Sequence, residues 1–392
     1  MTVMDQIPRF ADLDEATFRK EFSEPMRPVI LTGVASKWEA ISKWSFDYLR
    51  NTIGTRPVRV GASPNGLFNL NQQTGRWHDE RTYPFDEALN RIEQRHEPSK
   101  ESLVVLSPIR KNLPELLPDF SVPSLVRTHV LQAVNLWIGQ PRNVSFLHYD
   151  PSDNFLTQVA GRKKLVLFSP QQSEYLYPSD SRGFHEGRVD IDAPDFETFP
   201  LYRRAQGIEC ILHPGEMLFI PAFWWHHVYT LDQAISINFW WSSNIKNFIT
   251  PHGTRHAAFL GDSLCELLEH GFMDLTGFGN VLEAAAFAAQ SNQNRMAVLL
   301  AGSFLHTVMA KAHKTRETTA RPQTQPRDGM AALHLKLRST VATWEANSAR
   351  VPHWIVMHQS AVQSRDLSYD AREVAEMIAD IGALHARFRT AN

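Results

Sequence analysis

Short apolar runs separated by turn residues dominate the middle of the chain, from about residue 102 to 243. Runs of about four to eight β-branched, aromatic and aliphatic residues, bounded by Gly, Pro, Asn and Asp, are typical of β-strands. The runs here read LVVLS, LQAVNLWI, FLTQVAG, KLVLFSP, IECIL, EMLFIPA and AISINFWW. Several short strands at this spacing predict a β-barrel or β-sandwich.

The two flanks of this region carry other patterns. Before it, PVILTGV (28–34) predicts a buried strand and FDEALNRIEQ (85–94) an amphipathic helix. After it, apolar residues recur at helical spacing in SLCELLEHGF, NVLEAAAFAAQ and NRMAVLLAGSFLHTVMAKA. We therefore predict an α/β lead-in layer at 1–100 that packs on a β-rich core at 101–245, and a helical C-terminal region at 250–392 with a polar linker at 313–329.

Composition narrows the class of protein. The chain has 392 residues, of which 43% are hydrophobic and 21% charged, and its formal net charge is −2. This composition is that of a soluble globular protein, and it lacks the strong positive charge that phosphate binding favours, so we do not expect a nucleic-acid partner. Two cysteines without zinc-ligand spacing favour a reducing compartment, and with no leader or membrane span in the sequence we expect a cytoplasmic protein.

A candidate metal site begins in the segment NVSFLHYDPSDNF. His148 and Asp150 lie two residues apart in a run that should be extended, where side chains i and i+2 share one face. This pair alone is weak, because a chain with 17 His and 20 Asp contains about one His-x-Asp triplet by chance. A third ligand is needed before the pair indicates a metal.

The segment HPGEMLFIPAFWWHHVYTL supplies that candidate, because it places His226 and His227 after a tight turn and a buried strand. Two imidazoles in an otherwise apolar run are unusual for a core. Two His and one carboxylate on one face of an octahedron suit iron(II), which keeps adjacent positions open. Zinc with three protein ligands is the alternative, and it would need a separate catalytic base.

The ordered run of NLWIGQPRNVSFLHYDPSDNFLTQVAGRKKLVLFSPQQSEYLYP, PGEMLFIPAFWWHHV and SINFWW resembles the cupin-like JmjC oxygenases. Within that family the likeness is to the asparaginyl hydroxylase of hypoxia-inducible factor and to the tRNA wybutosine hydroxylase, over about residues 5 to 245. The resemblance implies a double-stranded β-helix, that is, a jelly-roll or cupin barrel. It also implies that His148, Asp150 and His226 hold iron(II), while His227 points to the opposite face of its strand.

The resemblance further implies 2-oxoglutarate as co-substrate and dioxygen as oxidant. The family holds the far carboxylate of 2-oxoglutarate with a lysine that matches Lys163 in AGRKKL. Without the resemblance, Lys163 would more simply face solvent beside Arg162 and Lys164. The remaining residues that match co-substrate or pocket positions are Ser145, Asn154, Asn238 and Trp240.

One departure stands out, because the hydroxylases often carry a co-substrate-binding Tyr where this chain has LVVLSPI (103–109). Only aliphatic residues and Ser107 are offered there. Substrate selection is expected from two segments around the mouth, 62–85, which contains Asn65, Trp77 and His78, and 171–205.

The resemblance implies hydroxylation of an unactivated C–H bond, with succinate and carbon dioxide as co-products. A peptide or protein side chain is the first substrate hypothesis. Hydroxylation of a small molecule or modified nucleoside, and N-methyl demethylation, are alternatives. A cupin-like binding protein with a degenerate site is the non-enzymatic alternative. The C-terminal helices are expected either to close a homodimer or to pack within the chain.

Overall fold

The computed structural model describes residues 6–68, 70–71, 76–77, 79–94, 101–179, 185–250, 253–254, 257, 274–275, 277–314, 334, 350–363 and 369–390. The chain divides into two compact units, Met1–Ser243 and Asn244–Asn392. The predicted helix SLCELLEHGF, most of the predicted linker and His78 lie outside the described residues. Among the helices that are described, none is long and apolar enough to cross a membrane.

The first unit is built on a large sheet that, within the described residues, contains nine strands. In spatial order these are β1 (Arg9–Phe10), β2 (Val29–Leu31), β14 (Met217–Ile220), β11 (Asp153–Ala160), β16 (Ala234–Trp241), β9 (Leu131–Gly139), β8 (Ser102–Pro108), β3 (Pro57–Ser63) and β7 (Glu80–Pro84). All neighbours pair antiparallel except β1 and β2. The predicted strands in the region 102–243 are therefore present, whereas the strand expected over 28–34 is only three residues long.

A smaller sheet faces the large one. Its strands, in order, are β13 (Ile208–Leu212), β12 (Lys163–Phe168), β15 (Trp225–Thr230), β10 (Val144–His148) and β4 (Leu67–Phe68). One apolar cluster joins Leu156 and Leu218 of the large sheet to Leu165 and Val228 of the small sheet. The two sheets thus pack face to face as a jelly roll, as predicted. A separate ribbon pairs β5 (Leu70–Asn71) with β6 (Arg76–Trp77).

Alternation along the large sheet separates an apolar outer face from a more polar inner face. On β16 the outer side chains Ile237 and Phe239 are fully buried in the main apolar cluster, whereas Asn238 between them points to the small sheet. Asn154 and Phe155 divide between the two faces of β11 in the same way. Polar side chains are therefore concentrated between the sheets, where an apolar sandwich would have none.

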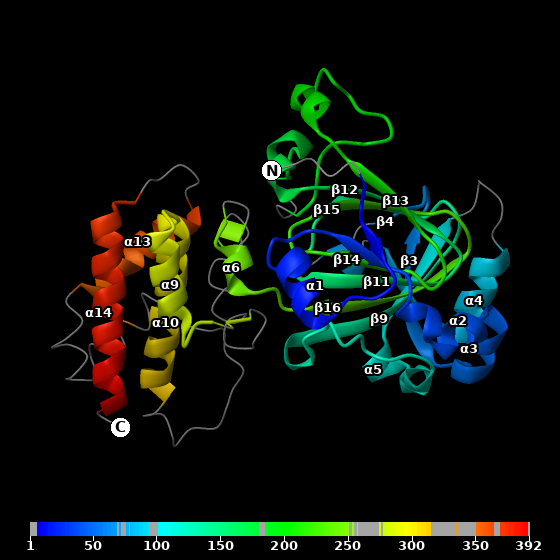
Figure 1. Cartoon of the computed structure of the whole chain (residues 1–392), viewed down its shortest axis with the longest axis horizontal. Helices are drawn as coiled ribbons and strands as arrows, with labels where there is room; N and C mark the ends of the chain where they lie inside the picture. The colour runs from blue at the N-terminus through cyan, green and yellow to red at the C-terminus, as the bar shows by residue number, and fades with distance from the viewer. Residues whose placement is uncertain are drawn as a thin grey trace. The chain divides into compact units, whose positions relative to one another are not determined.

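Helices of the N-terminal layer cover the outer face (Figure 1). They are α1 (Glu15–Phe18), α2 (Glu39–Lys43), α3 (Phe46–Ile53), α4 (Phe85–Gln94) and α5 (Ile109–Asn112), with shorter turns between them. The predicted amphipathic helix coincides with α4, whose buried residues Phe85, Ala88, Leu89 and Ile92 follow helical spacing. Ser45 caps α3 by accepting a hydrogen bond from the Tyr48 amide, and Gly54 with φ +64° ends it.

The connection between β12 and β13 is a long excursion. It begins with the 3₁₀ turn η5 (Pro170–Leu176) and ends with η6 (Pro200–Arg204), and the two turns contact each other. Between them, His185 to Gly187 returns to the barrel and pairs with the end of β10. Within the predicted substrate segment 171–205, His185 to Gly187 therefore lies against the end of β10.

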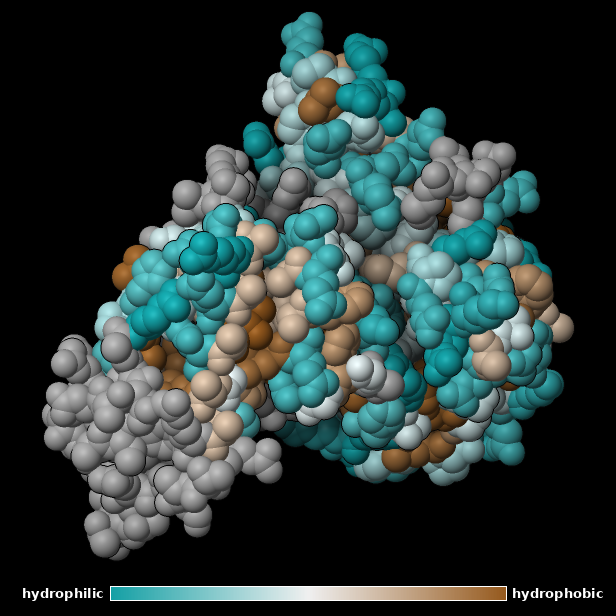
Figure 2. All heavy atoms as spheres, turned by 60° about the vertical axis from the view of Figure 1, so that its left-hand side comes forward, coloured by the Kyte–Doolittle hydropathy of each residue, from teal (hydrophilic) through white to brown (hydrophobic). Residues whose placement is uncertain are grey.

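The second unit is helical in its described part. Its elements are α6 (Ile245–Phe248), α9 (Val281–Gln290), α10 (Asn294–Lys314), α13 (Val351–Gln363) and α14 (Ala371–Thr390). The helix α10 packs against α9, α13 and α14, with Leu299 and Trp354 buried among them. Figure 2 shows a mostly hydrophilic surface with apolar side chains in scattered groups.

Candidate metal centre

Three side chains with metal-ligand atoms meet at the end of β10 and the start of β15. His148, Asp150 and His226 each offer a nitrogen or oxygen atom within 4.8 Å of the others. Antiparallel pairing places His148 directly opposite His226, with ring centroids 4.2 Å apart. Asp150 Oδ2 lies 3.8 Å from His226 Nε2. The fold therefore brings His226, which is 76 residues away in sequence from Asp150, to the His148 and Asp150 pair.

Local structure differs from the prediction in one respect. His148 is the last residue of β10, and the strand's register shifts between Ser145 and His148, so Asp150 follows the strand instead of lying on it. The Phe223 amide donates to the Asp150 carbonyl at 2.8 Å, which ties Asp150 to the turn before β15. In that turn Phe223 has φ +66°, and the Ala222 amide donates a hydrogen bond to Asp153 Oδ1 on β11. The turn therefore ties the backbone of Asp150 to the start of the strand that carries His226.

Hydrogen bonds define which nitrogen of each imidazole is free. His148 Nδ1 lies 2.7 Å from the Phe146 carbonyl, and His226 Nδ1 lies 2.9 Å from the Trp224 carbonyl. Because a carbonyl only accepts, both rings carry their proton on Nδ1 and present a lone pair on Nε2. This is the arrangement that a metal ion requires.

Burial shifts the pKa of two of the three candidate ligands, His226 and Asp150. Burial, aided by the nearby His148, moves the pKa of His226 well below 6.5, so its imidazole is neutral at physiological pH. Burial also raises the pKa of Asp150, against the opposing effect of His148 and His185. A divalent ion would compensate the carboxylate, and a set of two imidazoles and one carboxylate fits iron(II).

Lys163 is the first residue of β12 and points between the sheets. It is 8% exposed, and burial lowers the pKa of its ammonium from 10.5 to about 8. Its Nζ lies 5.9 Å from the Trp137 ring centroid, and no carboxylate pairs with it among the described residues. An ammonium in this position calls for an anionic ligand. The alternative in which Lys163 faces solvent is wrong, whereas Arg162 and Lys164 do pair with surface acids, Asp232 and Glu209.

Distance along β15 leaves room for that ligand. Lys163 lies opposite Thr230, four residues from His226 on the same strand. At about 3.3 Å per residue, the backbones of Thr230 and His226 are roughly 13 Å apart along β15. A lysine side chain and a five-carbon dicarboxylate together can span this distance.

The predicted amides and Trp240 also face this space. Asn154 pairs with Trp240 across β11 and β16, and both Asn154 Oδ1 and Trp240 Nε1 are buried without a hydrogen-bond partner in the described part of the chain. Such atoms suit a polar ligand between the sheets. Asn238 Oδ1 accepts from Trp137 Nε1 at 3.1 Å, and Ser145 lies opposite Val228. Trp137, which was not predicted, therefore lies between Lys163 and Asn238.

Three other positions singled out in the sequence lie outside the triad. His227 lies opposite Val166 on the outer face of β15, buried against the Tyr229 ring, and takes no part in the triad. The aliphatic segment near 103–109 turns Val104 and Leu106 inward, while Ser107 accepts a hydrogen bond from Asn112. Asn65 accepts from the Leu67 amide and from Ser63, so it shapes a turn.

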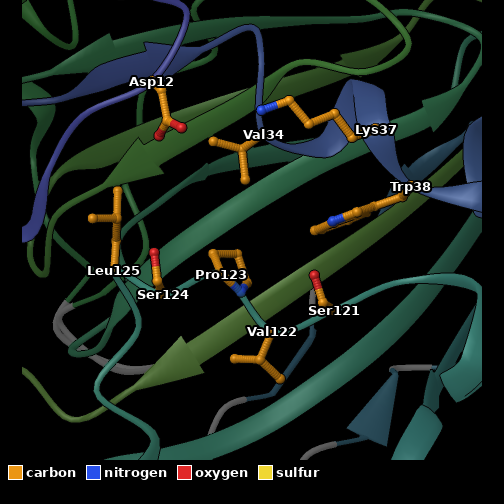
Figure 3. A pocket seen from close by; sticks show the side chains of 9 residues that line it. All are labelled: Asp12, Val34, Lys37, Trp38, Ser121, Val122, Pro123, Ser124 and Leu125. Atoms are coloured by element: carbon orange, nitrogen blue, oxygen red, sulfur yellow. The ribbon is translucent and has the colours of Figure 1, made fainter.

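A surface hollow of about 430 Å³ lies elsewhere in the first unit. Figure 3 shows its lining side chains in two facing groups, Asp12 to Trp38 and Ser121 to Leu125. The Trp38 ring packs on Phe239, which belongs to the outer face of β16. The hollow is therefore separated from the metal centre by the large sheet.

Comparison with known proteins agrees with this geometry. The profile of the family described as "Cupin-like domain" matches residues 15–247. "Lysine-specific demethylase 8" of Xenopus tropicalis is 33% identical over 57% of this chain and 50% of its own length. "tRNA wybutosine-synthesizing protein 5" of Danio rerio is 32% identical over 60% of this chain and 75% of its own length. "JmjC domain-containing protein D" of Dictyostelium discoideum is 29% identical over 60% of this chain.

The family match ends at residue 247, near the start of the second unit, and the chain spans about half the length of the demethylase it matches. The predicted cofactors, iron(II) and 2-oxoglutarate, are those of the JmjC members of the family and fit the donor set found between the sheets. The expected absence of a nucleic-acid partner finds no support, because one relative is named for a tRNA modification. From its barrel and from a family profile that covers more than half of its residues, the chain belongs to the cupin-like family.

Proposed function

We propose that the chain is an iron(II)- and 2-oxoglutarate-dependent oxygenase that hydroxylates an unactivated C–H bond on a peptide or protein side chain. The proposal rests on one observation. The His148, Asp150 and His226 triad and the buried ammonium of Lys163 both lie between the same two sheets. A zinc hydrolase would use such a triad, but it has no need of a buried cation at this depth. A binding protein has no need of either.

Each group of residues has a defined task in this proposal. His148, Asp150 and His226 hold the iron on one face and leave adjacent positions open. Lys163 binds the far carboxylate of 2-oxoglutarate, and Asn154 and Trp240 offer polar atoms beside it. The bound iron and 2-oxoglutarate supply oxygen activation, with succinate and carbon dioxide as products. The apolar layer of Leu156, Val228 and their neighbours excludes water from the site.

Support for a peptide substrate comes from the long excursion between β12 and β13. Its residues His185 to Gly187 lie beside His148 at the triad end of the barrel, and a long connection at such a place often carries substrate contacts. The demethylase relatives are named for lysine, which favours a side chain on a protein. The relative named for tRNA wybutosine synthesis favours a modified nucleoside as the second candidate.

The test is reconstitution with iron(II), 2-oxoglutarate and a peptide library under air. We expect succinate in proportion to peptide and a mass gain of one oxygen on the peptide. A demethylase would instead release formaldehyde, and a nucleoside hydroxylase would respond to tRNA and not to peptide. If metal-loaded protein binds 2-oxoglutarate but forms no succinate with either class, the binding-protein alternative replaces the proposal.

A further inference from the structure

The turn between β14 and β15, residues 221–224, contacts two of the three candidate metal ligands. Its Phe223 amide donates to the Asp150 carbonyl at 2.8 Å, and its Trp224 carbonyl lies 2.9 Å from His226 Nδ1. The first bond fixes the backbone of Asp150, and the second orients the imidazole of His226. Such contacts behind the ligands set how a metal ion is bound, so the position of the turn matters for the metal centre.

The backbone of this turn is in an unfavourable conformation. Phe223 has φ +66°, in the left-handed region that a bulky side chain rarely adopts. Within the turn, the Trp224 amide donates to the Pro221 carbonyl at 3.2 Å, the long end of the range for a backbone hydrogen bond. A residue in such a conformation persists only where the surrounding structure holds it. Contacts from outside the turn therefore stabilise it.

Asp153, the first residue of β11, provides one such contact. Asp153 Oδ1 accepts a hydrogen bond from the Ala222 amide at 3.0 Å and another from the Ser243 hydroxyl at 3.2 Å. The Asp153 side chain is fully buried. A hydrogen bond from an amide to a carboxylate is about twice as strong as one to a neutral acceptor. The carboxylate therefore ties the turn to the start of β11 and to the segment that follows β16.

Asp153 lies on the outer face of the large sheet, away from the metal centre. It is directly opposite Trp241 in the pairing of β11 with β16, and residues paired in this way project from the same face. Trp241 packs against Phe155 in the apolar cluster of the outer face. Asp153 is thus a carboxylate beside an apolar cluster, and the turn connects it to the ligands between the sheets.

Stability of the fold does not explain a carboxylate at this position. Burial raises the pKa of Asp153 to about 6, against the opposing effects of the Ala222 amide and the Arg127 charge. Its second oxygen, Oδ2, is buried and has no hydrogen-bond partner among the described residues. Because a carboxylate whose pKa is raised on folding lowers stability at neutral pH, an apolar residue would suit this face better. The carboxylate is accounted for by the turn that it holds.

We propose that Asp153 is a positioning residue of the metal centre: its carboxylate holds the turn at 221–224, and the turn places Asp150 and His226 for metal binding. This role rests on the proposed oxygenase function, in which the two residues hold iron(II). Without the Asp153 acceptor, the turn should relax from the conformation that Phe223 adopts, and the two ligands should no longer converge on one ion. The fold should survive, because β11 keeps its pairing with β14 and β16.

Mn(II) titration of the metal-free chain tests this without turnover, with the electron paramagnetic resonance of free Mn(II) as the signal. We expect Asp153→Ala to weaken Mn(II) binding by roughly 10- to 100-fold, the usual effect of losing a residue that orients metal ligands. Asp153→Asn keeps an oxygen that accepts from the Ala222 amide, so its Mn(II) affinity should stay within about threefold of the wild type. Asp153→Val, which fills the same space with apolar groups, carries the expectation for Asp153→Ala if that variant does not fold.

Visible absorption of Co(II)-loaded protein reports the geometry of the centre, because the bands depend on the number and arrangement of the ligands. At saturating Co(II), the bands of Asp153→Ala should shift from those of the wild type, and the bands of Asp153→Asn should coincide with them. A residue that only stabilised the fold would lower the amount of folded protein without a shift of the bands.

Phe155→Leu is the matched control, because Phe155 is fully buried two residues along the same face of β11. It should lower the thermal unfolding temperature and keep the Mn(II) affinity and Co(II) bands of the wild type. Equal loss of Mn(II) affinity in Phe155→Leu and Asp153→Ala would assign Asp153 a structural role and overturn the proposal. Unchanged affinity and bands in Asp153→Ala would overturn it as well.

Failure of the proposed function would look different. Succinate formation from 2-oxoglutarate in the presence of iron(II) is measured on the same wild-type preparation. Mn(II) binding without succinate would remove the oxygenase function and reduce the role of Asp153 to metal binding. Succinate formation, together with wild-type Mn(II) affinity in Asp153→Ala, would remove only the role of Asp153.

Discussion

The two faces of β11 and β16 consist of alternating residues, but one face packs into the apolar core and the other carries polar groups. Phe155 and Phe239 turn outward into a fully buried apolar cluster beneath the N-terminal helices. Asn154, Asn238 and Trp240 turn inward, where two buried polar atoms lack partners in the described part of the chain. The outer face therefore supplies apolar burial, which stabilises the fold, and the inner face supplies polar atoms that can bind a ligand.

This difference shows that stability and ligand binding depend on different residues of the barrel. A buried ammonium, the neutral imidazole of His226 and a carboxylate with a raised pKa all lie between the sheets and oppose folding. The aromatic layer outside compensates for them, with Phe239 packed against Trp38 and Phe120. Substitutions on the inner face should therefore change binding, and substitutions in the apolar cluster of the outer face should change stability.

The largest effect is expected for His226→Ala. Loss of one of three ligands should abolish iron binding and lower turnover by at least about 1000-fold, while the fold is kept because the imidazole stabilises no apolar cluster. Iron content after anaerobic loading and thermal unfolding measure the two quantities. His227→Ala is the control and should retain its iron. Full iron content in His226→Ala, with loss in His227→Ala, would reverse the assignment of the ligand.

The outer face is tested by Phe239→Ala. Removal of a fully buried aromatic side chain should lower the free energy of unfolding by about 3–5 kcal/mol, measured by urea denaturation. Affinity for 2-oxoglutarate in the folded variant should stay within about twofold. Asn238→Ala, one residue away on the inner face, should cost about 1–2 kcal/mol, because Trp137 Nε1 loses its acceptor. Equal stability losses at both positions would contradict the separation of the faces.

A smaller effect, with opposite signs on binding and stability, is expected for Lys163→Met. Affinity for 2-oxoglutarate should fall by roughly 10- to 100-fold, as for loss of a charge-assisted contact. Without ligand, the variant should be more stable at neutral pH by on the order of 1–3 kcal/mol, because it no longer buries an ammonium whose pKa is lowered. Calorimetry and thermal unfolding measure the pair. A variant that loses both affinity and stability would show that Lys163 supports the fold.

Much of this organisation could be predicted from the sequence, because local periodicity and turn residues encode strands directly. The helix over Phe85–Gln94 and the strands β8 to β16 follow from patterns that need no tertiary contact. His226 stood out because two adjacent imidazoles are unusual in an apolar run. His148 was part of a weak pair with Asp150, and Lys163 was singled out only by the resemblance. The resemblance to a known family then assigned their roles.

Three features could not be predicted, since they depend on tertiary structure. The shift in register that ends β10 at His148 moves Asp150 off the strand. The role of Trp137 depends on pairing between β9 and β16, which brings it to Asn238. Glu186 reaches His148 only because a long excursion returns to the barrel, and no local pattern encodes where such a segment returns.

The smallest effect is expected for the pH dependence of 2-oxoglutarate binding, which tests the inner face in the wild-type protein, without a substitution. The pKa of Lys163 is about 8 in the folded protein and 10.5 ordinarily. Between these values the unfolded chain binds more protons than the folded protein, so stability without ligand should rise as pH rises from 8. Affinity should change the other way, because the neutral amine loses its attraction for a carboxylate. With metal already bound, the dissociation constant should increase about tenfold between pH 7 and pH 9. Lys163→Arg keeps its charge over this range and should show a flat profile. A wild-type profile that is equally flat would mean that the ammonium does not hold the co-substrate.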